Sequence, residues 1–349
     1  MRSSWLVLAG RGTTIESWLS AQDELVFVSY PSRYLDRFLL NGRAIRRAVN
    51  GFRADVIFHF TAAWRGMPMP QVVRSVYSNL YFPEIQFWPT RPRLTYFKKK
   101  LIDQLRLAGT LRADGLIFEN RAMQARAQSL FDYPGDRTAY VRPSVAPEAT
   151  SGTRTRRFDR EPGRYRVLYL SSWYRNKNIH RLPEVAAQLR GADVKVQFVL
   201  SLDADHPEVK AEIVDRARDL EVLDAFEFVG QVHPLDVPAC VRSCDAMILL
   251  SQLECFSSNV TEAWTFGRPI LISDREWART ECGDAAVYVD REDPVAIAGS
   301  IYSLASDEKF ASTLVEAGRQ RLSRLNTPVS KAEEQIAFLE RIYRAGKKR

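Results

Sequence analysis

The sequence predicts an α/β protein of two doubly wound, Rossmann-like domains that face each other across a cleft. Short apolar runs rich in Val, Ile, Leu and Phe alternate with amphipathic stretches, which is typical of parallel sheets covered by helices on both faces. The runs form two sets on either side of 146–164, a polar stretch without an apolar period. The chain has 349 residues, which is enough for two ordinary domains.

The elements follow from apolar spacing. Alternation and continuous apolar runs predict strands in the N-terminal domain, residues 1–150, at 5–9, 25–29, 56–60, 115–118 and 139–142. After a linker at 151–164, strands of the C-terminal domain, residues 165–327, are predicted at 166–171, 194–200, 226–230, 246–250, 270–273 and 286–289. Helical spacing predicts helices over 179–190, 207–220, 258–266 and 293–305, with a last helix and basic tail over 328–349.

Composition excludes several classes of protein. With 46% hydrophobic and 26% charged residues the chain is neither disordered nor collagen-like. It contains no apolar run long enough to span a membrane. Its N-terminal apolar run is too short for a signal peptide, and four cysteines in this length indicate no disulfide framework. We therefore expect a cytoplasmic protein.

Charge is distributed unevenly between the two halves. Residues 1–145 hold 21 Lys and Arg against 11 Asp and Glu, whereas the remainder holds 29 against 31. The basic half predicts an anionic partner. Residues 91–112 combine Lys98, Lys99 and Lys100 with apolar residues at helical spacing. This helix would either attach the protein to the anionic inner face of a membrane or pack on the core with a solvated basic face. No nucleic-acid-binding module is visible, so nucleic acid is not expected as a partner.

The segment 245–273 carries the most chemical information. A predicted strand runs into a loop at 251–256, and a helix begins near Ser257, Ser258 and Asn259, which are good N-cap residues. Such a helix start presents free N–H groups and a partial positive charge, which suit a phosphate. Glu254 in the loop and Glu262 inside the helix can both point into the cleft, one on each side of this anion site.

This segment, ECFSSNVTEAWTFGRPILIS, resembles the signature region of the retaining GT-B glycosyltransferases of the bacterial group 1 family, with its two glutamates eight positions apart. The resemblance extends to ECGDAAVYVDREDP, FVGQV and YLSSWYRNKN, and more weakly to ADGLIFENRAM and TAYVRPSV. It covers 115 to about 325 and is poor before 115.

The resemblance implies roles for particular residues. Glu262 would accept hydrogen bonds from the ribose hydroxyls of a nucleoside-diphosphate sugar, and Glu254 would contact or orient the donor sugar. The helix start at Phe256, Ser257, Ser258 and Asn259 would face the sugar and distal phosphate, and Gly230 would border the nucleotide pocket. Lys177 would stabilise the departing diphosphate.

Two positions depart from the family pattern. Cys255 stands where the family usually has glycine, so the contacts with the sugar can shift. Ser172 stands where the family usually has an arginine, five residues before Lys177. A departing diphosphate needs cations, and we therefore expect Arg175 to substitute.

The sequence gives fewer indications of which residues of the N-terminal domain would contact the acceptor. Gly10 and Gly12 follow the first strand, and His59 ends the third. The family's histidine near the transferred sugar usually lies in a later loop, which here contains Asn79 and Glu84 but no histidine. His59, Asn79 and Glu84 remain alternatives, with a structural role for His59 among them.

These features predict an enzyme that transfers a sugar, with retention, from a nucleoside-diphosphate donor to a glycan or lipid-linked acceptor in cell-surface polysaccharide or glycolipid assembly. No cofactor or metal is expected, because Asp203-Ala204-Asp205 is interpreted as a helix start and Cys240 and Cys244 as buried thiols. The alternatives are a nucleotide-sugar epimerase of the same fold and a non-catalytic partner that binds nucleotide or nucleic acid. The base, the sugar and the acceptor stay open.

Overall fold

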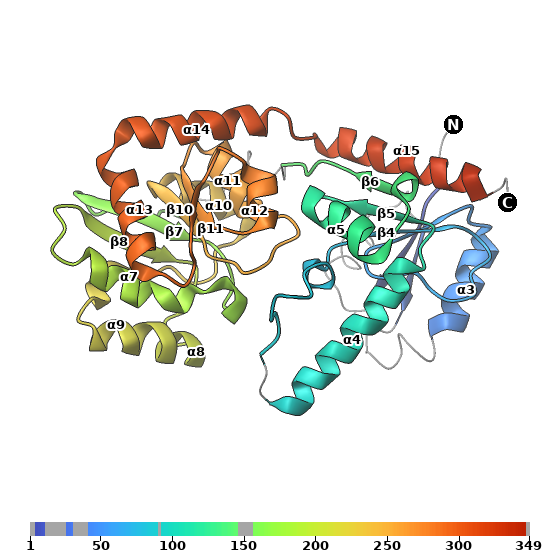
Figure 1. The fold of residues 1–349 in the computed structure, drawn as a ribbon, viewed down its shortest axis with the longest axis horizontal. Helices are drawn as coiled ribbons and strands as arrows, with labels where there is room; N and C mark the ends of the chain where they lie inside the picture. The colour runs from blue at the N-terminus through green and yellow to red at the C-terminus, as the bar shows by residue number, and fades with distance from the viewer. Residues whose placement is uncertain (1–3, 11–25, 31–40, 90–91, 146–155, 347–349) are drawn as a thin grey trace.

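The computed structural model describes residues 4–10, 26–30, 41–89, 92–145 and 156–346. Two α/β domains lie side by side, with the C-terminal domain on the left of Figure 1 and the N-terminal domain on the right. Every strand pairing in the described residues is parallel. The predicted α/β class with two doubly wound domains is confirmed.

The C-terminal domain is built on a six-stranded sheet of order β12-β11-β10-β7-β8-β9. Its strands are β7 (Arg164–Tyr169), β8 (Lys195–Leu200), β9 (Phe226–Phe228), β10 (Ala246–Leu249), β11 (Ile270–Ser273) and β12 (Val287–Val289). The strands β10 and β11 are buried along their whole length, and all their residues are apolar except Ser273 at the end of β11.

Helices cover both faces of this sheet. They are α7 (Leu182–Leu189), α8 (Pro207–Val209), α9 (Asp215–Asp219), α10 (Val237–Arg242), α11 (Ser258–Thr265), α12 (Glu276–Cys282), α13 (Pro294–Ser306) and α14 (Glu308–Leu322). A π-helical turn, Lys210–Val214, joins α8 to α9, so 207–219 is one interrupted helix. Short 3-10 turns lie at Arg175–Lys177, Ile179–Arg181, Leu223–Ala225 and Pro234–Asp236.

The N-terminal domain contains a four-stranded sheet of order β3-β4-β5-β6 and a separate pair, β1-β2. The strands are β1 (Leu6–Gly10), β2 (Val26–Tyr30), β3 (Ile57–His59), β4 (Gln71–Arg74), β5 (Gly115–Phe118) and β6 (Thr138–Tyr140). The helices are α3 (Asn41–Phe52), α4 (Arg93–Leu111) and α5 (Arg121–Phe131), with 3-10 turns at Ser78–Leu80 and Gly135–Arg137.

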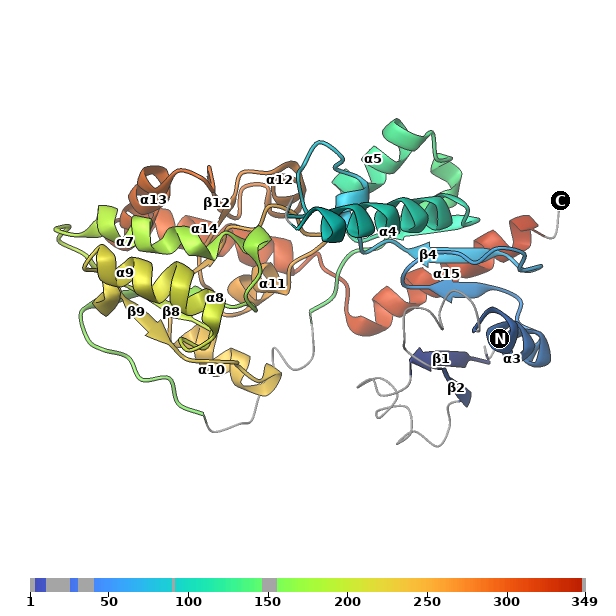
Figure 2. The ribbon, with the colours of Figure 1, turned by 90° about the horizontal axis from the view of Figure 1, so that it is seen from below.

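The last helix, α15 (Pro328–Gly346), returns to the N-terminal domain. The chain leaves α14 on the C-terminal domain and crosses over, and α15 then lies along the N-terminal sheet (Figures 1 and 2). Phe338 and Ile342 pack against Val72 and Ile117 in one buried cluster. Gly115 makes room for them, because a Cβ atom there would lie 2.9 Å from Ile342 and from the Phe338 ring.

The two domains touch through α5 and α12. The Arg126 guanidinium forms an ion pair with Glu276 at 2.7 Å, and the Asn120 amide donates a hydrogen bond to the carbonyl of Trp277 at 3.1 Å. In parallel sheets ligands bind beyond the carboxyl ends of the strands. The loops that follow β4, β5, β7 and β10 supply residues to the cavities between the domains.

Candidate functional site

A cleft of about 970 Å³ lies between the two domains. Its N-terminal wall comes from the turn after β4, the following loop and α4; its C-terminal wall comes from the turn after β7 and the loop after β10. The first wall contributes 76–79, 86–89, Lys99 and Arg106, and the second contributes 174–178, His180, 252–255, Arg291 and Glu292. Both domains therefore contribute polar groups to one cavity of a size suited to a small-molecule ligand.

Lys177 and Glu254 meet on the C-terminal wall of this cleft. The ammonium group of Lys177 forms an ion pair with the carboxylate of Glu254, and both side chains are largely buried. Asn178 follows with a φ of 57°, a left-handed conformation that asparagine and glycine tolerate best, which explains a Lys-Asn pair at this turn. The two sequence segments predicted to act together are in contact.

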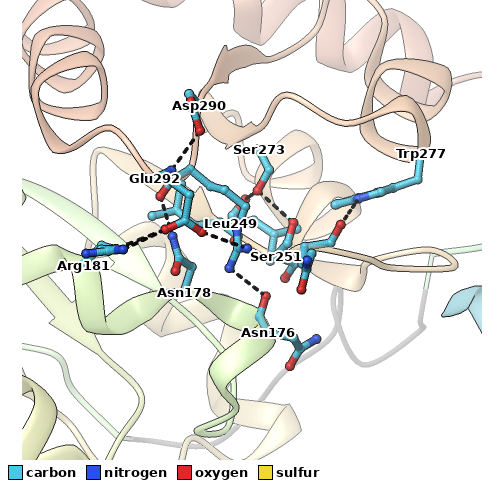
Figure 3. Close-up of polar contacts among 12 residues, drawn as sticks. Asn176, Asn178, Arg181, Leu249, Ser251, Ser273, Trp277, Asp290 and Glu292 are labelled. Atoms are coloured by element: carbon cyan, nitrogen blue, oxygen red, sulfur yellow. Dashed lines mark hydrogen bonds and ion pairs between the residues drawn. The ribbon is translucent and has the colours of Figure 1, made fainter. Parts of the chain in front are cut away.

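Arg291 joins the two loops that carry Lys177 and Glu254, and sequence reasoning missed it. Its guanidinium is buried, donates to the carbonyl of Leu250 at 2.9 Å and reaches the carbonyl of Asn176 at 3.4 Å. Asn178 donates in return to the carbonyl of Arg291 (Figure 3). Burial lowers the pKa of Arg291 from its usual value, while Glu292 at 3.1 Å counters this.

Further backbone contacts stiffen the same region. The Gln252 N–H donates to the carbonyl of Asn176 at 2.8 Å, and Trp277 donates through its indole N–H to the carbonyl of Gln252 at 3.2 Å. The Ser273 hydroxyl donates to the carbonyl of Ser251 at 2.8 Å (Figure 3). The first residues of the loop that presents Glu254, Ser251 and Gln252, are therefore bonded to neighbouring segments through their backbone.

Helix α11 starts directly after this loop. Ser257 occupies the N-cap position, Ser258 is exposed, and the Asn259 amide donates to the carbonyl of Leu170 at 2.9 Å, which fixes the helix start to the end of β7. The Ser257 side chain forms no capping hydrogen bond with the first turn. The α11 start therefore has the polarity that an anion requires.

Glu262, about one turn inside α11, differs from Glu254 in its position and in its hydrogen bonds. It lies outside the described lining of the cleft, contrary to the expectation that both carboxylates point into it. Its Oε2 atom is buried without a hydrogen-bond partner within the described residues, and burial raises the pKa of this carboxyl to about 7. A buried carboxylate oxygen that lacks a donor is uncommon in folded proteins.

Phe256 lines a second, smaller cavity of about 160 Å³, together with residues of α5 and α12. Glu281 lines the same cavity, and burial together with the nearby Glu254 raises its pKa well above the usual range. Cys255, in contrast, lines the main cleft, and burial raises the pKa of its thiol to about 11, so it is uncharged at neutral pH.

Arg175, expected from sequence to substitute for a missing cation, lines the cleft, and its guanidinium forms an exposed ion pair with Glu212 at 2.6 Å. Gly230 follows β9 with a φ of 67°, a conformation that favours glycine, and it lies outside the described lining of both cavities. The sequence signal at Gly230 therefore corresponds to a backbone requirement.

The acceptor-side candidates differ in position. Asn79 lines the cleft, where its amide donates to Asp103 at 2.8 Å. Glu84 instead pairs with Arg126 at 2.8 Å beside the α5–α12 contact. Gly10 ends β1, and Gly12 lies outside the described residues.

His59 has the place of a structural residue. It is buried at the end of β3, its Nε2 atom is 2.9 Å from the Gln71 side-chain oxygen, and its ring packs edge-on against Trp64. Burial lowers its pKa to about 4, so the ring is neutral, and His59 lies outside the described lining of the cleft. The structure favours the structural alternative for this residue.

Comparison with known proteins agrees with this geometry. Residues 153–321 match the family model "Glycosyl transferases group 1". A curated glycogen synthase of Mycobacterium tuberculosis is 24% identical over 159 residues, which are 45% of this chain and 38% of that protein. The chain thus matches less than half the length of this curated relative.

Solved structures share the fold across both domains. A glycosyltransferase from Rickettsia africae superposes with a TM-score of 0.71 at 12% identity, over 97% of this chain and 90% of that one. HepE from Anabaena, in complex with UDP and glucose, superposes with a TM-score of 0.71 at 14% identity, over 95% and 91%. At these identities the likeness establishes the two-domain GT-B fold. Through residues 153–321, which include the paired glutamates and the lysine turn, the C-terminal domain is similar to the group 1 glycosyltransferases.

Proposed function

We propose that the protein is a glycosyltransferase that moves a sugar, with retention of configuration, from a nucleoside-diphosphate donor to a glycan or lipid-linked acceptor. The observation that carries the proposal is the contact between Lys177 and Glu254 in the cleft. Glu254 lies three residues before Ser257, the N-cap of α11, and the described lining of the cleft ends at Cys255. HepE, which shares the fold, was solved with UDP and glucose.

In this mechanism the donor diphosphate lies against the start of α11 and Lys177, and Glu262 accepts hydrogen bonds from the ribose hydroxyls. The bond between the sugar carbon and the diphosphate oxygen breaks while the acceptor hydroxyl attacks from the same face. The hydroxyl proton passes to the departing phosphate. Negative charge grows on the leaving oxygen in the transition state, where a fixed cation contributes most. Arg291 holds the Lys177 turn and the Glu254 loop together, so it positions both groups.

A direct assay tests this function. The protein is incubated with a panel of nucleoside-diphosphate sugars and a lipid extract, and products are identified by mass spectrometry. The expected result is transfer from one donor, with the anomeric configuration retained. Interconversion of the donor sugar without transfer would favour an epimerase instead. Binding of nucleotide without either reaction would favour a non-catalytic partner.

We also propose that α4 attaches the protein to an anionic membrane surface. The structure supports this, because α4 exposes its apolar side: Leu94, Phe97, Leu101 and Leu105 are 82%, 64%, 57% and 47% exposed. At about 100° per residue these four positions share one face of the helix. Within the described residues, no helix combines the length and apolarity needed to cross a membrane. The expected mode is therefore peripheral, from the cytoplasmic side.

Charge around this stripe complements an anionic surface. Exposed Arg93 and Lys98 and half-buried Lys100 flank the apolar positions. Such a basic, amphipathic face suits the interface of an anionic bilayer. Phe97→Glu should lower binding to vesicles of phosphatidylglycerol and phosphatidylcholine in a sedimentation assay. Phe310→Glu, a change at another exposed aromatic residue on α14, serves as the matched control. Equal binding by both variants would refute the attachment.

A further inference from the structure

The inner side of α4 has a different chemistry from its exposed side. Lys99, Asp103 and Arg106 are spaced by four and three residues, so they share one helix face. Lys99 and Arg106 line the cleft, on the wall opposite Lys177. Some basic residues of α4 are thus exposed to solvent, whereas Lys99 and Arg106 line the cleft.

The buried carboxylate of Asp103 forms hydrogen bonds with several side chains on this face of α4. It is 8% exposed, and one of its oxygens accepts hydrogen bonds from Asn79 at 2.8 Å and from the Trp88 indole at 2.5 Å. Its other oxygen lies 3.3 Å from the Arg106 guanidinium. With donors on both oxygens, Asp103 fixes a tryptophan, an asparagine and an arginine at the cleft wall.

The two cations lie against aromatic rings. The Lys99 ammonium is 4.1 Å from the centre of the Trp88 ring, and the Arg106 guanidinium carbon is 4.2 Å from that of Tyr77. Among the described residues, no carboxylate lies within ion-pair distance of Lys99. An ammonium stacked on a ring, as Lys99 is, keeps its charge and can still donate to an anion, and a guanidinium such as that of Arg106 carries several N–H donors beyond the one it directs at Asp103.

The charges of the two walls differ. On the C-terminal wall Lys177 faces Glu254, Arg175 faces Glu212 and Arg291 faces Glu292. On the N-terminal wall no carboxylate lines the cleft within the described residues; Arg106 pairs with the buried Asp103 behind the wall, and Lys99 stacks on Trp88. In the proposed function the donor diphosphate takes its cation, Lys177, from the C-terminal wall. The N-terminal wall therefore presents positive charge that suits a second anion.

We propose that Lys99 and Arg106 form a subsite for a phosphate group on the acceptor. The proposal rests on the proposed function above and deepens it by naming the acceptor class. A guanidinium fork and an ammonium together match the charge and the several oxygens of a phosphate ester. The phosphate belongs either to a lipid carrier, whose chain would follow the exposed stripe of α4 into the membrane, or to a soluble sugar phosphate.

The test uses calorimetric titration of three probes: glucose, glucose 1-phosphate and octyl phosphate. Each is titrated into protein that holds the nucleoside diphosphate, so that the donor cations are already engaged. We expect both phosphates to bind and glucose to bind far more weakly. Lys99→Met should weaken phosphate binding about 10-fold, the effect of losing one charge-assisted contact. Lys309→Met, at an exposed lysine of α14, should leave phosphate binding unchanged.

The outcomes separate this subsite from the proposed function. Stronger binding of octyl phosphate assigns the phosphate to a lipid carrier, and stronger binding of glucose 1-phosphate assigns it to a soluble sugar. Equal phosphate binding by Lys99→Met and wild type would overturn the subsite, and so would an equal loss in Lys309→Met. A loss of nucleoside diphosphate binding in Lys99→Met would assign the cation to the donor and overturn the subsite too. Failure of wild-type protein to bind any nucleoside diphosphate would count against the proposed function alone, because the phosphate titrations can be run without it.

Discussion

Replacing Glu262 with glutamine should stabilise the protein and impair nucleotide binding at the same time. Burial raises the pKa of the Glu262 carboxyl from 4.5 to about 7. The folded protein therefore holds this proton more tightly than the unfolded chain does. The stability that this proton confers is complete below pH 4.5 and is lost as pH rises through 7.

The size of the effect follows from that difference in pKa. At about 1.4 kcal/mol per pKa unit, ionising buried Glu262 costs about 3 kcal/mol above pH 7. Glutamine has nearly the same shape and does not ionise, so Glu262→Gln removes this cost at pH 8 and changes little at pH 4.5. For a domain of this size each kcal/mol raises Tm by roughly 2–4 °C. Scanning calorimetry at both pH values measures the difference.

Nucleotide binding should change in the opposite direction. A carboxylate accepts hydrogen bonds from both ribose hydroxyls, and losing charge-assisted bonds costs about 1.5–3 kcal/mol. Isothermal titration of the free nucleoside diphosphate should show a Kd at least tenfold higher for Glu262→Gln. In wild type the affinity should also fall below pH 7, as the carboxyl takes up its proton, and this dependence should flatten in the variant.

The variant Glu254→Gln is the control that shows whether the rise in Tm comes from the burial of Glu262 or would follow any glutamate-to-glutamine change in this site. Glu254→Gln removes the ionic partner of Lys177, so it should lower Tm at pH 8 rather than raise it. If Glu262→Gln lowered Tm at pH 8, the carboxylate would have a stabilising partner in the folded protein and the reasoning from burial would be wrong. An unchanged nucleotide Kd would remove Glu262 from the ribose role.

Three further predictions concern catalysis. Lys177→Ala should lower kcat about 10²–10³-fold with a smaller change in donor affinity, and a raised KM at the wild-type kcat would make Lys177 a simple binding contact. Arg291→Met should lower kcat because it releases the Asn176 turn from the loop after β10, whereas Arg291→Lys should recover part of it; equal kcat in both variants and wild type would exclude a positioning role. Turnover should persist in EDTA, and loss of activity restored by Mn²⁺ would require a metal in the mechanism.

Much of the fold is predictable because parallel strands buried on both faces are conspicuous in sequence. β10 and β11 are continuous apolar runs, and both were predicted to within one residue. β4 was missed because it is only four residues long and begins and ends with polar side chains, Gln71 and Arg74. The return of α15 to the N-terminal sheet was also missed, since an apolar face does not reveal which sheet it covers.

The orientation of α4 could not be predicted from its periodicity. Its periodicity indicated an amphipathic helix, and one interpretation placed the apolar face on the core. The structure places Leu94, Phe97, Leu101 and Leu105 in solvent, whereas Asp103, bonded to Asn79 and Trp88, lies on the inward side. Leu107 and Leu111 of the same helix pack against the core. Periodicity carries no information about the partners of Asp103.

Site residues could be predicted where they belong to a segment with a recognisable sequence, and they could not be predicted where they do not. Glu254 and Lys177 came from two recognisable segments, whereas Arg291 acts through backbone carbonyls of both loops. Every residue has a backbone carbonyl group, so the sequence does not show which carbonyl groups Arg291 contacts. His59 was considered because it ends a strand, and only its contact with Gln71 shows that it serves packing.

The most direct test of the central claim is calorimetric titration of UDP, GDP and ADP into the wild-type protein and into Glu262→Gln. The proposed donor site requires that wild type bind one of these nucleotides at a single site and that the variant bind it at least tenfold more weakly. Absence of binding by all three nucleotides, or equal affinity in the two proteins, would contradict a donor site built on α11.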